Sequence, residues 1–431
     1  MDRQDRPLES GRKSRSCGVH HAVTSSGHRQ HASLGVAAPG PGPCPWLVWS
    51  AADDRPARAP GDLAADWCRD FRCRPGAVTA NRRRDRQLGA GAARHSACRP
   101  CHRPTARRPV AARRPPGNRA VAAFGAVIAF SSPGDLLRLP AGDSLPGSDA
   151  WNRAEIPAVS QVTARDGAPL TYRLYPARAD RAVVLVHGSS GTSFSMHKLA
   201  QALQAAGATV YSVSLRGHGG SGTTNGDSSY LGQLDDDLVD FVQAERLSDT
   251  KIHRTLMGFS SGGGFVLRTA SGPNRALFDD YIAIAPYIAH DSPTGRPASG
   301  GWTRVAVPRI VALSILDGFG LPWFQDLPVV RFATAAKADD RRTPVYSFRL
   351  ATGMHLDRDW RAAIGRIDRP TAVIVGADDE LFQADRYTAL FAGLNPRISV
   401  EVVPGLGHMD MIAQARACAA VAALWRRLAG D

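Results

Sequence analysis

The sequence predicts an α/β protein over residues 157–430, with a mostly parallel, doubly wound sheet covered by helices. Two observations predict this class. Continuous aliphatic runs alternate in this region with segments whose apolar residues recur at helical spacing, and short polar joints separate them. A glycine-rich pentapeptide, Gly258–Gly262, stands directly behind an apolar run and ahead of a helical pattern, which predicts a sharp strand-to-helix turn.

The first elements of this region predict a βαβ unit. Leu170–Tyr175 alternates apolar and polar residues as an edge strand would, and Ala182–Val186 is a continuous aliphatic run, typical of a buried parallel strand. Apolar residues at helical spacing over 196–203 predict a crossover helix that ends at Gly207. Thr209–Val213 then forms the next strand.

The remaining elements continue the alternation of strand and helix. The pattern predicts helices at 234–242, 261–270 and 384–392, strands at 255–257, 281–285, 371–375 and 398–403, and a closing helix that ends about Leu428. Residues 287–360 lose this periodicity and gather large apolar side chains. An insertion of that length predicts a helical lid over the carboxyl edge of the sheet.

Residues 1–119 differ in composition from the rest of the chain. They hold 23 Lys and Arg against 9 Asp and Glu, a difference of +14, so residues 120–431 hold the remaining 30 of each sign. This quarter has no Ile or Tyr and one Phe, too little apolar surface to offset the entropy of folding, so we expect it to be disordered. Its Arg-rich, Lys-poor composition is also typical of GC-rich DNA translated in an over-extended reading frame. In that case residues 1–119 are not a native polypeptide.

Two patterns in this quarter are typical of binding functions. Arginine runs such as Arg82–Arg84 are typical of nucleic-acid or anionic-membrane contacts, but an over-extended reading frame explains them more simply, and no nucleic-acid partner is expected. The segment Cys98–His102 matches a haem-attachment pattern or half of a zinc site. The export-like segment lies downstream of this motif and no second cysteine pair follows at zinc spacing, so no metal or cofactor is predicted.

The apolar stretch Ala120–Phe130 follows several arginines and precedes Ser131–Pro133. Its 11 residues are too few to span a bilayer comfortably. A basic flank, an apolar centre and a small polar exit resemble a signal or signal-anchor, which would associate the protein with a membrane or export it. The other interpretation is an Ala-rich helix without a targeting role, in a cytoplasmic protein. In both cases residues 120–156 connect the N-terminal quarter to the folded domain.

Ser260 lies at the apex of the turn at Gly258–Gly262, with its hydroxyl free to react. A serine hydroxyl does not attack a carbonyl unaided, and it needs a histidine to take its proton and a carboxylate to orient that histidine. An acidic run, 378–380, follows the strand at 371–375, and His408 follows the strand at 398–403. Open parallel sheets place their sites at these strand ends.

A negatively charged intermediate needs backbone N–H donors. The sequence predicts two donors, the amide of Ser261 and that of Ser189 or Ser190 in the loop after Ala182–Val186. Gly188 would let this loop approach a substrate. The candidate side chains for substrate contact are His187, His290, Trp302, Trp323 and Phe324, the last three as part of an apolar pocket. The more common roles are loop shaping for a histidine such as His187 or His218, and packing within the insertion for any single aromatic residue.

At these residues the sequence resembles the α/β-hydrolase superfamily, most closely its serine-aminopeptidase, monoglyceride-lipase and lysophospholipase-like branch. The matching motifs are His187-Gly188, Arg-Gly-His-Gly-x-Ser-Gly at 216–222, Gly-Phe-Ser-x-Gly-Gly at 258–263, Gly-x-x-Asp at 376–379 and Gly-x-x-His at 405–408. The resemblance implies an α/β-hydrolase fold, with Ser260 as nucleophile, His408 as base, and Asp379 rather than the adjacent Asp378 as the acid. One departure is Ser214, where the branch usually carries Asp, so any salt bridge made there is missing; we expect no loss of catalysis from it.

The predicted function is that of a serine hydrolase acting on a small, apolar carboxylic ester. The apolar insertion and the zero net charge of residues 120–431 favour an ester, and serine at 260 argues against epoxide hydrolases and haloalkane dehalogenases. Two alternatives stay open. A catalytically inactive hydrolase fold could serve as a binding module, and an aminopeptidase could hold a substrate ammonium through acidic residues of the insertion, namely Asp317, Asp326, Asp339 and Asp340. The sequence predicts neither acyl chain length nor oligomeric state.

Overall fold

The computed structural model describes residues 117–134, 151–297, 301–333 and 342–430. Nearly all of the Arg-rich quarter lies outside the described residues, so the expectation of disorder there is not tested. The arginine run at 82–84 and the segment Cys98–His102 lie outside them as well.

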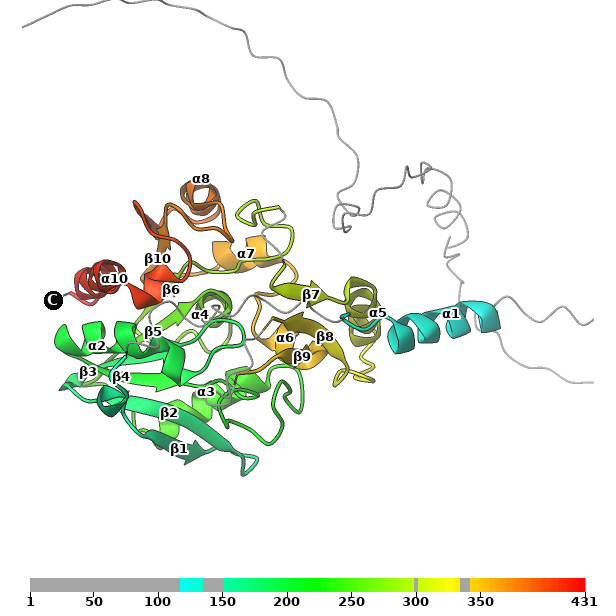
Figure 1. Ribbon diagram of the computed structural model, residues 1–431, viewed down its shortest axis with the longest axis horizontal. Coiled ribbons are helices and arrows are strands. Elements are labelled where there is room, and N and C mark those ends of the chain that lie inside the picture. Colours follow the sequence, from blue (N-terminus) through cyan, green and yellow to red (C-terminus); the bar gives the residue numbers. More distant parts are fainter. Residues whose placement is uncertain (1–116, 135–150, 298–300, 334–341, 431) are drawn as a thin grey trace, which may run out of the picture. The chain divides into compact units, whose positions relative to one another are not determined.

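The described chain is built around an eight-stranded sheet with the strand order β1-β2-β4-β3-β5-β6-β10-β11 (Figure 1). Strands β1 and β2 pair antiparallel, as do β2 and β4, and every other pair is parallel. The prediction of a mostly parallel, doubly wound α/β sheet is confirmed. The strands are β1 Val159–Thr163, β2 Pro169–Tyr175, β3 Arg178–Val186, β4 Ala208–Val213, β5 His253–Phe259, β6 Asp280–Ile284, β10 Thr371–Gly376 and β11 Ser399–Val403.

The prediction of β2 as an edge strand is wrong, because β1 pairs with its outer side. β1 is only five residues long, and none of them is buried. A short strand with this burial carries no apolar run in its sequence, which explains why the pattern of residues did not predict it.

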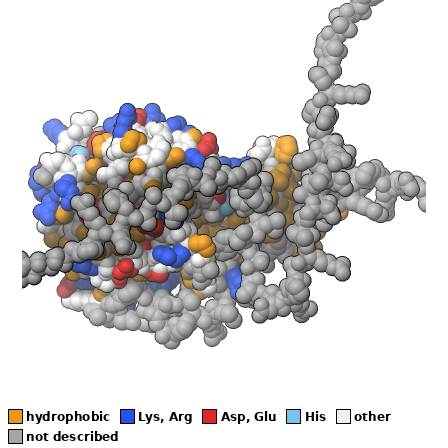
Figure 2. Space-filling view, turned by 90° about the horizontal axis from the view of Figure 1, so that it is seen from above, with side chains coloured by type: hydrophobic (Ala, Val, Ile, Leu, Met, Phe, Trp, Pro, Cys, Tyr) orange, Lys and Arg blue, Asp and Glu red, His pale blue; other side chains and the backbone are white. Residues whose placement is uncertain are grey.

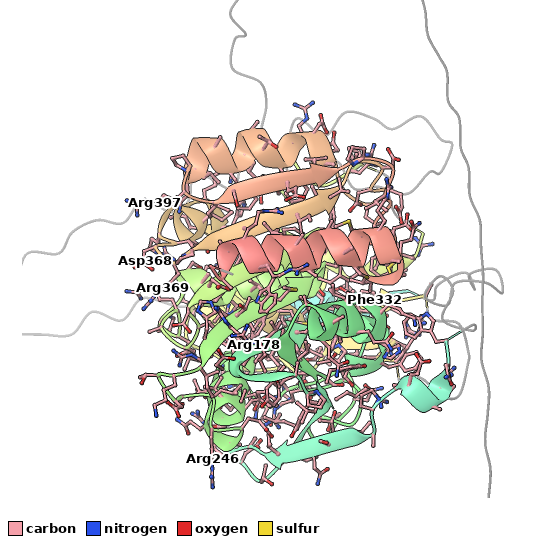
Figure 3. The ribbon with its side chains drawn as sticks, turned by 90° about the vertical axis from the view of Figure 1, so that its left-hand side faces the viewer. Arg178, Arg246, Phe332, Asp368, Arg369 and Arg397 are labelled. Atoms are coloured by element: carbon pink, nitrogen blue, oxygen red, sulfur yellow. The ribbon has the colours of Figure 1, made fainter. Side chains whose placement is uncertain are left out.

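Helices cover both faces of the sheet. α2 (His197–Ala205) and α10 (Ala415–Leu428) pack side by side on the face seen in Figure 3. α4 (Ser261–Ser271) packs on β5 and β6 and contacts α7 (Trp360–Gly365), which in turn contacts α8 (Ala384–Leu394). The remaining elements are α3 Gln233–Ala244 and the short helices η2 Arg153–Glu155, η3 Ser193–Met196 and α9 Asp410–Ala413.

The inserted segment, residues 287–360, contains α5 (Val307–Gly318), α6 (Phe348–Gly353) and a second, antiparallel sheet. This sheet was not predicted, since its strands are three to five residues long, too short for a periodic signal: β7 Thr303–Val305, β8 Pro328–Phe332 and β9 Val345–Ser347. Whether the inserted segment acts as a lid stays a prediction.

The apolar stretch Ala120–Phe130 lies within α1, Gly117–Phe130. This helix packs against α5, and the Arg309 guanidinium donates hydrogen bonds to the carbonyls of Ile128 and Ala129 at 2.8 and 3.1 Å. Figure 2 shows hydrophobic side chains gathered at the end of the molecule that carries these two helices. Among the described residues, no helix is long and apolar enough to cross a bilayer.

We expect the pair His253–Asp280 at the start of β5 and β6 to make folding stability depend on pH. The hydrogen bond to Asp280 raises the pKa of His253 above its usual value. A raised folded-state pKa stabilises the fold fully below the unfolded pKa, about 6.5, and this stabilisation is lost as the pH rises through the folded pKa. Urea unfolding between pH 6 and 9 should therefore show a decline in stability that is smaller in His253→Gln. Identical pH dependence in both proteins would contradict this.

Candidate active site

Ser260 lies between the end of β5 and the start of α4, with φ of 57° and ψ of −118°. A non-glycine residue rarely adopts these angles, and such strain costs about 1–3 kcal/mol. The surrounding backbone holds it in place, because the Ser260 amide donates to the Ile284 carbonyl at 2.9 Å and the Ser260 carbonyl accepts from Tyr287 at 3.0 Å. The turn therefore presents the Ser260 hydroxyl at the carboxyl edge of the sheet.

Two glycines of the pentapeptide are required by close backbone approaches. A Cβ on Gly258 would lie 2.3 Å from the Gly262 carbonyl oxygen, and a Cβ on Gly262 would lie 2.4 Å from that of His187. Real Cβ atoms do not come this close to backbone oxygens. Glycine at these positions lets the helix start directly behind the strand and beside the 187–191 loop.

Gly262→Ala is expected to lower the free energy of unfolding by about 1–3 kcal/mol, since the added methyl displaces the His187 backbone. Gly393→Ala in α8 is the matched control, because a Cβ there meets no heavy atom within 4 Å. Alanine has the higher helix propensity, so this control should gain roughly 0.5–1 kcal/mol. Denaturant unfolding of both variants checks the prediction, which fails if Gly262→Ala is as stable as the wild type.

His408 connects Ser260 to a carboxylate. Its Nε2 lies 3.0 Å from Ser260 Oγ, and its Nδ1 lies 2.8 Å from Asp379 Oδ2. With His408 Nδ1–H donating a hydrogen bond to Asp379, the Nε2 lone pair faces the serine hydroxyl and can accept its proton. All three side chains are buried, so their mutual interactions are weakly screened by water.

The carboxylate at His408 belongs to Asp379 and not to Asp378, whose side chain is exposed. The second oxygen of Asp379, Oδ1, accepts hydrogen bonds from the amides of Leu381 and Phe382 at 2.9 and 2.8 Å. These two bonds fix the carboxylate plane and aim Oδ2 at the imidazole. Asp379 is thus the carboxylate that contacts His408, and its role as the catalytic acid stays a prediction.

Several residues around His408 were not predicted. The imidazole packs between the rings of Phe259 and Phe382, with centroids 4.7 and 5.1 Å away, and its backbone amide donates to Glu380 at 2.8 Å. Two of these residues adjoin predicted site residues in the sequence, which is the one local signal that could have indicated them. The packing limits rotation of the ring away from Ser260.

The 187–191 loop lies directly against the nucleophile candidate. A Cβ on Gly188 would lie 3.1 Å from the Cβ of Ser260, so the backbone at this position lies close to the Ser260 side chain. Of the two amides considered for the oxyanion site, that of Ser190 donates to the Tyr346 hydroxyl at 2.6 Å. The Ser189 amide is therefore the better candidate for the first donor. The second, at Ser261, lies in the first turn of α4, where the helix dipole also favours negative charge.

Two buried histidines and Tyr346 hold this loop. His218 Nδ1 lies 3.1 Å from the Arg216 carbonyl and must carry a proton, so Nε2 accepts from the Tyr346 hydroxyl at 2.6 Å. His187 bonds loop backbone in the same way, through the Gly188 carbonyl at 2.8 Å and the Leu215 amide at 3.1 Å. Burial lowers the pKa of His187 to about 4 and that of His218 well below its usual value, so both are neutral near pH 7.

The other predicted substrate contacts are dispersed. Trp302 stacks on Phe332 at 5.4 Å in the inserted segment, Trp323 and Phe324 are 58% and 54% exposed, and His290 is exposed. None of the described ring contacts joins these aromatic residues to Ser260, Asp379 or His408. Their role in substrate binding stays a prediction.

Comparisons with known proteins place these features in context. The family model described as "Serine aminopeptidase, S33" matches residues 177–412, more than half of the chain. A soluble variant of monoglyceride lipase from Saccharomyces cerevisiae is similar in structure, with 17% identity, a TM-score of 0.51, and coverage of 68% of this chain and 98% of that chain. A monoacylglycerol lipase from Paleococcus ferrophilus has 20% identity, a TM-score of 0.45, and coverage of 63% and 98%. No curated protein matches the sequence.

Proposed function

This chain belongs to the serine aminopeptidase (S33) family of α/β-hydrolases, and from that premise we propose that it is a serine hydrolase that cleaves carboxylic esters. The observation that carries the proposal is the continuous chain of contacts from Ser260 Oγ to His408 at 3.0 Å and from His408 to Asp379 at 2.8 Å. Nucleophilic catalysis by serine needs these three groups in this order.

In the proposed reaction, Ser260 Oγ attacks the acyl carbon of the ester while His408 Nε2 takes the hydroxyl proton. The carbonyl oxygen becomes negatively charged and accepts hydrogen bonds from the amides of Ser261 and Ser189. The intermediate collapses, the C–O bond to the alcohol breaks, and His408 returns the proton to the departing oxygen. Water then attacks the acyl carbon while His408 takes its proton. The acyl C–Oγ bond breaks, the carboxylic acid leaves, and His408 returns the proton to Ser260 Oγ.

The preference for an ester over a peptide is supported by the apolar character of the inserted segment. Exposed aromatic side chains follow α5, among them Phe319 and Trp323. An aminopeptidase would need carboxylates to hold a substrate ammonium. Of the acidic residues of the insertion, Asp317 accepts a hydrogen bond from Gln325 at 3.1 Å, Asp326 is exposed, and Asp339 and Asp340 lie outside the described residues.

A substrate panel tests the proposal. Wild type and Ser260→Ala are assayed on p-nitrophenyl esters of graded acyl length and on aminoacyl p-nitroanilides. Hydrolysis of esters that requires Ser260 supports the proposal. Hydrolysis of the anilides alone would establish the aminopeptidase alternative. If neither class of substrate is hydrolysed in a Ser260-dependent way, the binding-module alternative is the one that remains.

Tyr346→Phe is expected to lower kcat roughly tenfold with little change in KM. The variant leaves the Ser190 amide and His218 Nε2 without their shared partner, and each unsatisfied buried group costs about 1–3 kcal/mol. The 187–191 loop should then relax away from the geometry that donates to the oxyanion.

Tyr281→Phe is the matched control, since its buried hydroxyl donates to the Arg275 carbonyl at 2.9 Å on a strand away from this loop. It should lose stability and keep its kcat. Equal kcat values for the two variants would show that Tyr346 does not position the loop.

A further inference from the structure

A cavity of about 440 Å³ opens near the outer end of the sheet, and its lining does not include Ser260, Asp379 or His408. Its walls come from the segment that precedes and begins β1, from β2, from the start of η3 and from the loop after β4. The residues that line it are Arg153, Ile156, Pro157, Ala158, Val159, Arg173, Thr192, Ser193, Phe194, Ser214 and Gly219. The volume is that of a site for a small organic molecule.

The formal charge of this cavity is positive. Two lining residues are arginines and none is acidic. In the part of the chain that the structure describes, no ion pair joins Arg153 or Arg173 to a carboxylate. Each has other contacts: Arg153 lies over the Phe194 ring at 4.9 Å, and the Arg173 guanidinium donates to the Pro157 carbonyl.

The Arg173 side chain is half-buried, and its Nε is buried without a hydrogen-bond partner among the described residues. Burial lowers the pKa of this guanidinium below its usual value. Placing a cation in such surroundings without a counter-charge is unfavourable. An anion in the adjoining cavity would offset this cost by charge complementarity.

The rest of the lining defines what kind of anion fits. Ser214 Oγ accepts a hydrogen bond from the Ser193 amide at 3.0 Å, and Thr192 Oγ1 accepts one from the Phe194 amide at 3.2 Å. Neither bond uses the hydroxyl proton, so both hydroxyls can donate to a ligand. Phe194 and Ile156 add apolar wall. A ligand with an oxyanion group and an apolar body would use both kinds of surface.

We propose that this cavity binds a small organic oxyanion, a carboxylate or a phosphate ester with an apolar group, through Arg153 and Arg173. The site is separate from the proposed catalytic residues and does not depend on their activity. Serine at position 214 leaves the positive charge of the cavity unopposed, because an aspartate there would place a carboxylate in the same cavity.

The test measures binding of three probes with the same ring to the full chain by isothermal titration calorimetry at low salt: benzoate, phenyl phosphate and benzyl alcohol. Benzoate, phenyl phosphate or both should bind saturably and more weakly as salt rises, and benzyl alcohol should not. The tighter of the two anions identifies the head group. Arg173→Gln and Arg153→Gln should each weaken anion binding roughly tenfold or more, as expected for the loss of a charge-assisted contact.

Ser214→Asp should weaken anion binding strongly, since its carboxylate can still accept the Ser193 amide while it cancels one of the two positive charges and repels an anionic ligand. Arg397→Gln is the matched control, because Arg397 is exposed beside β11 at the opposite edge of the sheet and is labelled in Figure 3. It removes the same charge and should bind as the wild type does. Equal binding by benzyl alcohol, or anion binding that survives in Arg153→Gln and Ser214→Asp, would overturn the proposal.

Discussion

Asp379→Asn is expected to lower kcat by roughly 10⁴-fold while the fold is kept. The reason lies in the two backbone amides that bind Asp379 Oδ1. They require an acceptor, so the asparagine carbonyl oxygen should take this position and its NH₂ group should face His408 Nδ1. The imidazole then carries its proton on Nε2, where it can no longer accept the proton of the Ser260 hydroxyl.

The adjacent Asp378 provides the control for this variant. Asp378→Asn removes the same charge one residue away, on an exposed side chain, and should change kcat by less than about twofold, as surface substitutions usually do. The measurement is kcat on the best ester of the substrate panel. Similar losses in both variants would mean that local charge, and not the orientation of His408, explains the effect.

Ser260→Ala is expected to lower kcat by about 10⁴- to 10⁶-fold, the largest effect of any single substitution in the site. The change removes the attacking oxygen and keeps the Cβ, so the turn at Ser260 is retained. The hydroxyl bonds His408 and carries no other described contact, so the free energy of unfolding should stay nearly constant. A thermal unfolding curve beside the kinetic assay separates loss of chemistry from loss of structure.

Ser261→Ala is the matched control for this variant. Its hydroxyl is buried without a hydrogen-bond partner among the described residues, and the proposed mechanism uses only its backbone amide, which alanine keeps. Activity close to that of the wild type is expected. Full activity in Ser260→Ala, or inactivity in Ser261→Ala alone, would show that Ser260 is not the nucleophile.

The parallel strands were predictable because burial on both faces leaves continuous aliphatic runs. Val183–Val186 is almost fully buried, and the same holds for β10. The turn at Gly258–Gly262 was predictable for a related reason, since close backbone approaches demand glycine at fixed positions. In both cases the structural constraint acts on residues that are neighbours in the chain, so a short stretch of sequence is enough to predict the element.

The features that the sequence did not predict depend on contacts between distant segments. Tyr346 lies 156 positions from Ser190, and nothing near either residue indicates that they bond. The choice of Asp379 over Asp378 needed the family motif, because only the path of the loop decides which carboxylate turns inward. The short strands β7–β9 pair with each other across long connections and carry no periodic signal of their own.

Reaction with a fluorophosphonate probe tests the central claim most directly. If Ser260 is a nucleophile activated by His408 and Asp379, the full-length wild-type protein should gain one covalent adduct, and mass spectrometry of its peptides should locate it on Ser260. Labelling should be lost in Ser260→Ala and slowed strongly in Asp379→Asn. An unlabelled wild type that is folded by thermal unfolding, or an adduct on a residue other than Ser260, would contradict the account.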